Sequence, residues 1–171
     1  MKIILLGYMG SGKTTVGKCL SQKIFIPFYD LDHYIEKREK SSIAEIFKNK
    51  GEIYFRKIEH HYLQEFLEKK DEYVLSLGGG TPCYAGNMNL ILESNVHSIY
   101  LQANIPTLKE RIKQNKTKRP LIASLSNDKI SEFIVKHLFE RKNFYEQAEY
   151  TISVNHKDVN TIAAEIRIAL H

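Results

Sequence analysis

A glycine-rich loop near the start of the chain restricts its possible folds more than any other feature. Residues 7–14, GYMGSGKT, match the pattern G-x-x-x-x-G-K-[ST] and directly follow the apolar run KIILL at 2–6. Glycines permit backbone angles that other residues avoid, so successive N–H groups can face one phosphate at a helix N-terminus. Val16, Leu20 and Ile24 then recur at helical spacing. The order strand, loop, helix predicts an α/β fold that holds the phosphates of a nucleotide.

Each polar residue of this loop has a chemical role that suits phosphate binding. Lys13 is placed to reach the β- and γ-phosphates, and the Thr14 hydroxyl is placed to bind Mg²⁺. The alternative is a chance match in an ordinary turn, because the pattern fixes only four positions. The flanking strand and amphipathic helix argue against chance. We expect the nucleotide to be bound by Gly10, Ser11, Gly12, Lys13, Thr14 and Thr15.

The rest of the chain alternates between apolar runs and helical periodicity. Short runs rich in Ile, Val, Leu and Tyr predict strands at 2–7, 26–30, 72–77, 97–102 and 150–154. Helical spacing marks the segments around 16–24, 43–47, 63–67, 130–138 and 158–170, and Ser41 or Ser42 is placed to cap the second of these. This alternation predicts a central parallel sheet of about five strands flanked by helices.

The composition suits one soluble domain that spans residues 1–171. No repeat or Gly/Ser linker divides the 171 residues, and no apolar run approaches the length of a spanning helix. Two cysteines without C-x-x-C spacing favour a reducing, cytoplasmic setting over a disulfide framework or a zinc site. The net charge of +5 is compatible with nucleic acid, an anionic membrane or an anionic small molecule. The lysines are dispersed, so we favour a small molecule.

Residues with chemical potential follow the predicted strands. In parallel sheets ligands bind outside the carboxyl ends of the strands. Asp30 and Asp32 follow the second strand, where Asp30 suits Mg²⁺ and Asp32 suits acceptance of a hydroxyl proton. The simpler reading of Asp32 is a cap on a helix that begins at His33. The glycines at 78–80 follow the third strand and predict close approach of a ligand, although a plain turn before a proline is the alternative.

Three arginines are less informative when each is taken alone. Arg56 lies on a predicted helix with Glu59 three residues later, which is typical of an exposed ion pair. Arg119 lies in the basic loop KTKRPL, where it suits closure over phosphates, a solvated loop or a nucleic-acid patch. No aromatic residue interleaves with these charges, which argues against nucleic acid. Arg141 lies near the end of a long predicted helix and has no distinctive neighbours in sequence.

Taken together, these motifs identify a resemblance. GYMGSGKTT, DLD, FRKIE, LGGG, RPL and ERKNFY occur in the order and at roughly the spacing of shikimate kinases, and the whole chain resembles that family. The resemblance implies a P-loop kinase of the nucleoside-monophosphate-kinase type, with an acceptor-binding segment at about 31–62 and a lid at about 112–125. It implies transfer of the γ-phosphate of ATP to the 3-hydroxyl of shikimate with Mg²⁺ as cofactor. We also expect a monomer that binds ATP and shikimate and neither nucleic acid nor membrane.

The resemblance also assigns roles to individual residues. Lys13, Asp32 and Arg119 would be catalytic, with Arg119 as the lid arginine, while Thr14 and Asp30 would serve Mg²⁺. Arg56 and Arg141 would hold the shikimate carboxylate, and Asp32 would bind the ring hydroxyls. The shikimate site would be completed by Gly78, Gly79 and Gly80, with Gly79 presenting its backbone N–H. A basic residue before the lid would lie near adenine, and either Arg111 or Lys113 fits that position.

Two alternatives to this function belong to other kinds of protein. Another small-molecule P-loop kinase, such as gluconate kinase, would also require a carboxylate site, so Arg56 alone does not separate the two. The combination of DLD, FR and GGG favours shikimate. A GTP-dependent switch protein requires an N-K-x-D motif, and the chain has NKTK at 115–118, with Lys118 in place of the Asp. We therefore expect an enzyme and not a switch.

Overall fold

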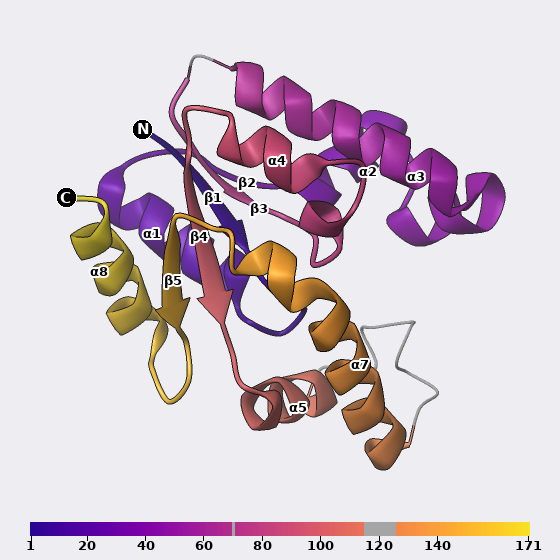
Figure 1. Cartoon of the computed structure of the whole chain (residues 1–171). Helices are drawn as coiled ribbons and strands as arrows, with labels where there is room; N and C mark the ends of the chain where they lie inside the picture. Colours follow the sequence, from indigo (N-terminus) through magenta and orange to yellow (C-terminus); the bar gives the residue numbers. More distant parts are fainter. Residues whose placement is uncertain (70, 115–125) are drawn as a thin grey trace.

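A parallel sheet forms the centre of the molecule. The computed structural model describes residues 1–69, 71–114 and 126–171. In these ranges the strands are β1 (Lys2–Leu6), β2 (Phe28–Asp30), β3 (Tyr73–Ser76), β4 (His97–Gln102) and β5 (Tyr150–Ser153). They pair in the order β2-β3-β1-β4-β5, and every pair is parallel (Figure 1). The prediction of a parallel sheet of about five strands is confirmed, with each strand inside its predicted range.

Strand β1 lies in the middle of the sheet, which explains its unbroken apolar sequence. It pairs with β3 in the register Ile4 opposite Leu75 and with β4 in the register Ile4 opposite Ser98. The side chains of residues 3–6 are completely buried. A strand with helices on both faces has no side that turns to water, so hydrophobic residues do not alternate with polar ones. The loop that follows β1 therefore starts from a rigid support.

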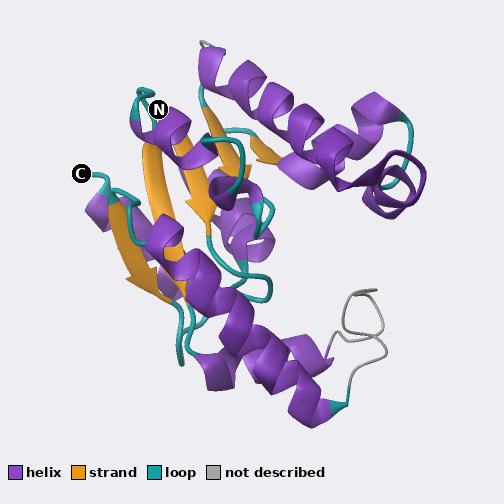
Figure 2. Cartoon of the chain, turned by 45° about the vertical axis from the view of Figure 1, so that its right-hand side comes forward, coloured by secondary structure: helices purple, strands orange, loops and turns teal. Residues whose placement is uncertain are grey.

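Helices flank the sheet (Figure 2). Their bounds are α1 (Lys13–Ile24), α2 (Leu31–Glu39), α3 (Ile43–Glu68), α4 (Asn87–Leu92), α5 (Ile105–Gln114), α7 (Asn127–Tyr145) and α8 (Val159–Ala169), and a short 3₁₀ helix, η1, spans Thr81–Cys83. Helix α1 packs on α8, α2 on α3, and α5 on α7. Helices α4 and α5 lie outside the segments for which the sequence periodicity predicts a helix. Within the described ranges, no helix is long and apolar enough to cross a membrane.

The helix that follows β2 starts earlier than the sequence suggests. Asp30, and not Asp32, is the N-cap of α2, and its Oδ1 accepts a hydrogen bond from the His33 backbone N–H at 3.4 Å. The alternative reading of Asp32, as the cap of a helix beginning at His33, is therefore wrong. Asp32 lies in the first turn of α2 instead. One aspartate ends the strand and caps the helix, and this leaves the second available for other contacts.

The next helix begins where its capping residues predict. Ser42 caps α3 with a capping box, in which its hydroxyl accepts from the Glu45 N–H and the Glu45 carboxylate accepts from the Ser42 N–H. Of the two serines predicted as caps, Ser42 is thus the correct one. Gly51 has φ of 82° and interrupts α3, so the helix consists of two pieces joined at a kink. The longer second piece carries Arg56.

Candidate active site

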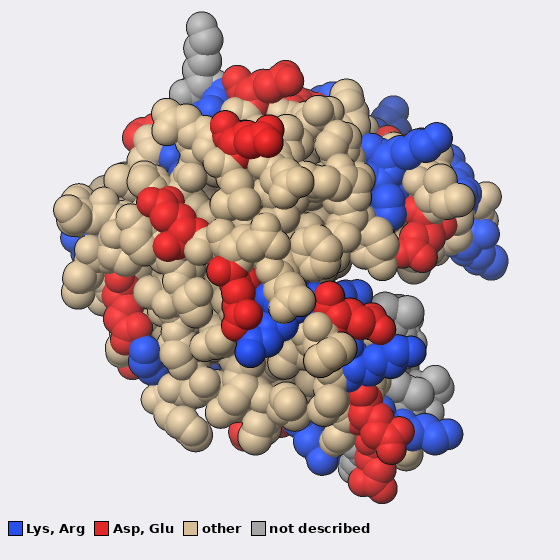
Figure 3. All heavy atoms as spheres, viewed as in Figure 1, with Lys and Arg blue, Asp and Glu red and all other residues tan. Residues whose placement is uncertain are grey.

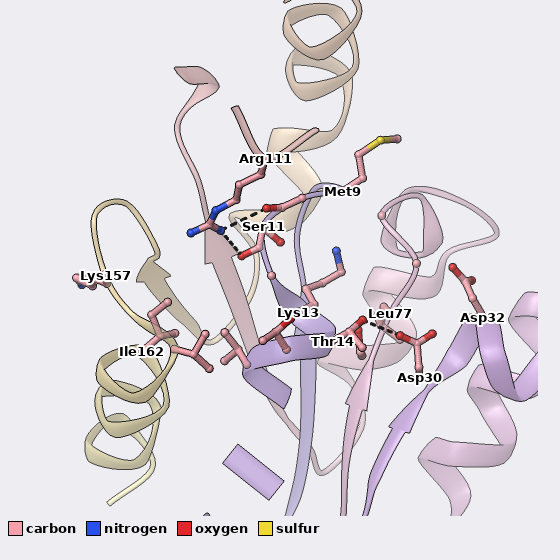
Figure 4. Close-up of a pocket in the computed structure, with 18 residues that line it drawn as sticks. Met9, Ser11, Lys13, Thr14, Asp30, Asp32, Leu77, Arg111, Lys157 and Ile162 are labelled. Carbon is pink, nitrogen blue, oxygen red and sulfur yellow. Dashed lines mark hydrogen bonds between the residues drawn. The ribbon is translucent and has the colours of Figure 1, made fainter. Parts of the chain in front are cut away.

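The carboxyl ends of the central strands converge on one cavity. Its volume is about 530 Å³. It is lined by the loop and helix start at 9–16, by Asp30 and Asp32 at and just after the end of β2, by residues 76–79 at and just after the end of β3, and by Arg111 on α5 (Figure 4). The prediction that these residues gather at the ligand edge of the sheet agrees with this geometry. Lys157, Val159 and Ile162 also line the cavity, and sequence reasoning missed them. They follow β5, so the same strand-end rule would have found them.

The loop after β1 uses glycine where other residues would be strained. Gly7, Gly10 and Gly12 have φ of 142°, 84° and 96°. A Cβ at Gly7 would also lie 2.8 Å from the carbonyl oxygen of Leu101, which is too close for any side chain. This backbone turns the chain so that α1 begins directly at Lys13, with its N-terminal end in the wall of the cavity. A helix N-terminus with its backbone N–H groups is a favourable site for phosphate.

The Lys13 side chain is hydrogen-bonded to the backbone of this loop. Its ammonium donates hydrogen bonds to the carbonyl oxygens of Gly7 at 2.8 Å and Tyr8 at 3.0 Å. The side chain is buried, yet it lines the cavity. A buried cation requires hydrogen-bond partners, and the two carbonyls supply them. The lysine is therefore held beside the place where the loop would receive phosphates.

Thr14 and Asp30 form a pair of oxygen ligands in the cavity wall. The Thr14 hydroxyl donates to Asp30 Oδ2 at 2.9 Å (Figure 4). Hydroxyl and carboxylate oxygens are donors that Mg²⁺ accepts, and in nucleotide sites phosphates and waters complete its shell. Among the described residues, no cluster of three or more His, Cys, Asp or Glu side chains is arranged to hold a metal by itself. The pair fits a magnesium ion that arrives with the nucleotide.

Asp32 is a weaker acid than an ordinary aspartate. Its pKa is raised from 3.8 to about 6, chiefly by burial and then by the nearby carboxylates of Asp30 and Glu59, while Lys13 lowers it. Gly78 allows this close placement, because a Cβ there would lie 3.0 Å from Asp32 Oδ1. A carboxylate with a pKa near neutrality can accept a proton more readily than an ordinary aspartate. Asp32 therefore suits the handling of a hydroxyl proton.

Arg56 belongs to a buried network and not to an exposed ion pair. Its Nη1 donates to Glu59 Oε2 at 2.8 Å, where Glu59 is only 1% exposed and Arg56 is 16% exposed. Glu59 Oε1 accepts a second hydrogen bond, at 2.6 Å, from the Thr81 hydroxyl. The predicted pairing of Arg56 with Glu59 is therefore correct, but its reading as a surface pair is wrong. The buried Glu59 carboxylate therefore holds the Arg56 guanidinium, and through Thr81 it joins α3 to the segment after β3.

The glycines after β3 lie next to Arg56 and Arg141. A Cβ on Gly80 would lie 3.0 Å from Arg56 Nη2, and one on Gly79 would lie 3.6 Å from Arg141 Nη1. The Tyr145 hydroxyl donates to the Gly79 carbonyl, so α7 is bonded to the glycine run one turn beyond Arg141. The space-filling view is hollowed between α3 and α7, and both basic and acidic side chains border the hollow (Figure 3). The pair of guanidinium groups beside the glycine run suits a small anion.

The two basic candidates on α5, Arg111 and Lys113, differ in whether they face the cavity. Arg111 donates through Nη1 to the carbonyl oxygens of Gly10 at 3.3 Å and Ser11 at 3.2 Å, and it lines the cavity. Lys113 is exposed and does not line the cavity. This placement favours Arg111 as the basic residue beside the nucleotide. Arg119 and residues 115–125 of the predicted lid lie outside the described residues.

Comparisons with known proteins agree with this geometry. A family model described as shikimate kinase matches residues 9–171. A shikimate kinase of Flavobacterium psychrophilum is 47% identical over 165 residues, which cover 96% of both chains. The crystal structure of a shikimate kinase from Bacteroides thetaiotaomicron superposes with a TM-score of 0.92 and 33% identity, over 99% of this chain and 98% of the other. A shikimate kinase from Acinetobacter baumannii in complex with shikimate gives a TM-score of 0.87 and 32% identity, over 99% and 92%.

Proposed function

The chain belongs to the shikimate kinase family, and we propose that the cavity described above carries out ATP-dependent phosphorylation of shikimate at its 3-hydroxyl. The products are shikimate 3-phosphate and ADP. One observation carries the assignment of roles. The phosphate-binding loop with Lys13 and the glycine run beside Arg56 and Arg141 meet at one sheet edge, and Asp32 lines the cavity at that edge. This supports a site with a donor end in the cavity and an acceptor end beside it, at Arg56 and Arg141, which do not themselves line the cavity.

The donor end holds the phosphates of ATP. The N-terminus of α1 and the loop N–H groups bind them, and Lys13 places its positive charge beside the β- and γ-phosphates. When bound at Thr14 and Asp30, Mg²⁺ supplies further positive charge to the phosphate oxygens. Arg111 lies beside the loop and binds near the adenine. The resemblance adds Arg119 over the phosphates, and that role rests on the sequence alone.

The acceptor end holds a carboxylate and orients a hydroxyl. The guanidinium groups of Arg56 and Arg141 are planar donors that match a carboxylate edge to edge. Gly79, beside Arg141, presents its backbone N–H to the acceptor. Asp32 binds the hydroxyl that is phosphorylated and accepts its proton as the new oxygen–phosphorus bond forms. Alignment of the hydroxyl with the γ-phosphate supplies most of the catalysis, because phosphoryl transfer requires little covalent help from the protein.

The remaining expectations concern the setting of the enzyme. Gluconate also carries a carboxylate, so the arginines would suit it, but the matched family favours shikimate as the acceptor. We propose that the protein acts in the cytoplasm as a monomer on small molecules, without nucleic acid or membrane partners. Its two cysteines are free, which supports a reducing compartment.

The test compares acceptors and one arginine variant. ADP release is measured with shikimate, gluconate and nucleoside monophosphates, and only shikimate is expected to support turnover. Arg56→Ala should raise the KM for shikimate at least about 30-fold, because it removes one partner of a desolvated charge pair, and should leave the KM for ATP within about twofold. Lys57→Ala, on the exposed neighbouring position of α3, is the matched control. Absence of turnover with shikimate would reject the proposal.

A further inference from the structure

Tyr84 covers one face of the Arg56 guanidinium. Arg56 Cζ lies 3.9 Å from the centroid of the Tyr84 ring and 5.1 Å from that of Phe55. A cation placed over an aromatic face is attracted by the negative charge density of the ring. We infer that Tyr84 is a positioning residue, which holds the plane of the Arg56 guanidinium in the orientation that receives the acceptor carboxylate. This inference rests on the proposed role of Arg56.

The stacked ring fixes the arginine without using its donors. Glu59 occupies Nη1 at 2.8 Å, and the exposed Glu52 lies 3.4 Å from both Nε and Nη2. A carboxylate binds guanidinium in the plane of the group, through its N–H edges. The ring of Tyr84 contacts the face instead, so it does not compete with a bound carboxylate. The two glutamates limit rotation within the plane, and Tyr84 limits tilt out of it.

The segment that carries Tyr84 is itself held firmly. Asn87 is completely buried, and its side chain donates to the Thr81 carbonyl at 2.8 Å while its Oδ1 lies 2.7 Å from His60 Nδ1. The Asn87 backbone N–H also donates to the Tyr84 carbonyl at 2.9 Å. His60 lies one turn beyond Arg56 on α3. Arg56 lies on α3, and the segment that carries Tyr84 is bonded to α3 through Asn87 and His60. Both partners of the contact are therefore held by the same helix.

Tyr84 is not explained as a residue of the hydrophobic core. It is 38% exposed, and it lines a hollow beside α3 together with Arg56, Ile53 and Lys57. Burial of apolar area therefore accounts for only part of its placement. The close contact with Arg56 accounts for the rest, and it predicts an effect on substrate recognition that a purely structural role would not produce.

The experiment compares two substrates that differ only at the carboxylate. The ratio kcat/KM is measured for shikimate and for shikimate methyl ester, with wild type, Tyr84→Leu, Tyr84→Phe and Phe25→Leu. Tyr84→Leu should lower kcat/KM for shikimate about fivefold, through a higher KM, and should leave the value for the ester unchanged. Tyr84→Phe keeps the ring and should retain most of the wild-type value. Phe25 is 94% exposed at the end of α1 and serves as the control.

Each outcome either supports the inference or overturns it. Three outcomes would overturn it. Tyr84→Leu could lower kcat/KM equally for both substrates, or it could leave kcat/KM for shikimate unchanged. Tyr84→Phe could also lose as much kcat/KM as Tyr84→Leu, which would show that the ring face is not responsible. Arg56→Ala in the same assay separates this inference from the proposed function. If Arg56→Ala affects acid and ester equally, the carboxylate site itself is wrong. If Arg56→Ala discriminates between them and Tyr84→Leu does not, only the role of Tyr84 is rejected.

Discussion

Replacement of Asp32 by Asn should stabilise the fold and remove the activity together. The carboxylate is largely withdrawn from water beside Asp30 and Glu59, and its pKa is raised from 3.8 to about 6. At pH 8 the folded protein therefore carries a negative charge that its surroundings disfavour. Asn has nearly the same shape and no charge. Its amide oxygen cannot accept the proton of a hydroxyl as a carboxylate does.

The size of the effect follows from the difference between the folded and unfolded pKa. Above pH 6 the group is ionised in both states, and the folded state is disfavoured by up to about 3 kcal/mol. Burial of the replacement amide offsets part of this gain, so we expect the free energy of unfolding to rise by about 1–2 kcal/mol. Between about pH 4 and pH 6 the folded state binds more protons than the unfolded state. Its stability therefore falls as pH rises through this range, and Asp32→Asn should gain much less at pH 4.5.

Urea unfolding followed by circular dichroism, without nucleotide or Mg²⁺, measures the stability at pH 8.0 and pH 4.5. Coupled ADP release at pH 8.0 measures turnover, which should fall at least about 100-fold. Asp71→Asn, at an exposed position before β3, is the matched control and should change neither quantity. The reasoning is refuted if Asp32→Asn is no more stable than wild type at pH 8.0, or if its gain is the same at both pH values.

Two further predictions concern glycines. Gly17→Ala should destabilise the fold by about 2 kcal/mol despite the better helix propensity of alanine, because the new Cβ would lie 2.4 Å from the Phe28 ring. Thermal unfolding should then show a midpoint about 4–8 °C lower. An unchanged midpoint would show that β2 moves aside. Gly80 has φ of −89°, so Gly80→Ala costs no backbone strain, but its Cβ would lie 3.0 Å from Arg56 Nη2. It should raise the KM for shikimate several-fold with stability unchanged; an unaltered KM would show that the guanidinium has room to shift.

Local signals in the sequence predicted most of the fold and much of the site. Each strand is a short apolar run with clear ends, and the ligand-edge rule then brings the loop of Lys13 together with Asp30 and Asp32. The alternative in which Asp32 caps α2 fails because Asp30 occupies the cap, and helix caps depend on one or two residues of register. Arg111 and Lys113 were equally suitable in sequence, since only the rotation of α5 decides which of them faces the cavity.

The contacts that tie the acceptor site together left no pattern in the sequence. Tyr84 stacks on Arg56, and Tyr145 bonds to Gly79, so each pair joins segments that lie far apart along the chain. Tyr84 belongs to no periodic run or spaced motif, and Tyr145 ends the motif ERKNFY without any sign in the sequence of its contact with Gly79. The burial of Glu59 was equally hidden, because an Arg and a Glu three residues apart on a helix usually form an exposed pair.

The order of the strands also governs how the chain acquires its site during synthesis. β1 pairs with β3 and β4, so residues 2–6 have no strand partner until residues 73–76 and 97–102 have been made. At roughly 5–20 residues per second, this leaves the apolar segment KIILL waiting about 5–20 seconds. The glycine loop that it supports is therefore made well before the strands that hold it in a working shape. A ribosome that stalls before residue 97 would release a chain with an exposed, aggregation-prone strand and no nucleotide site.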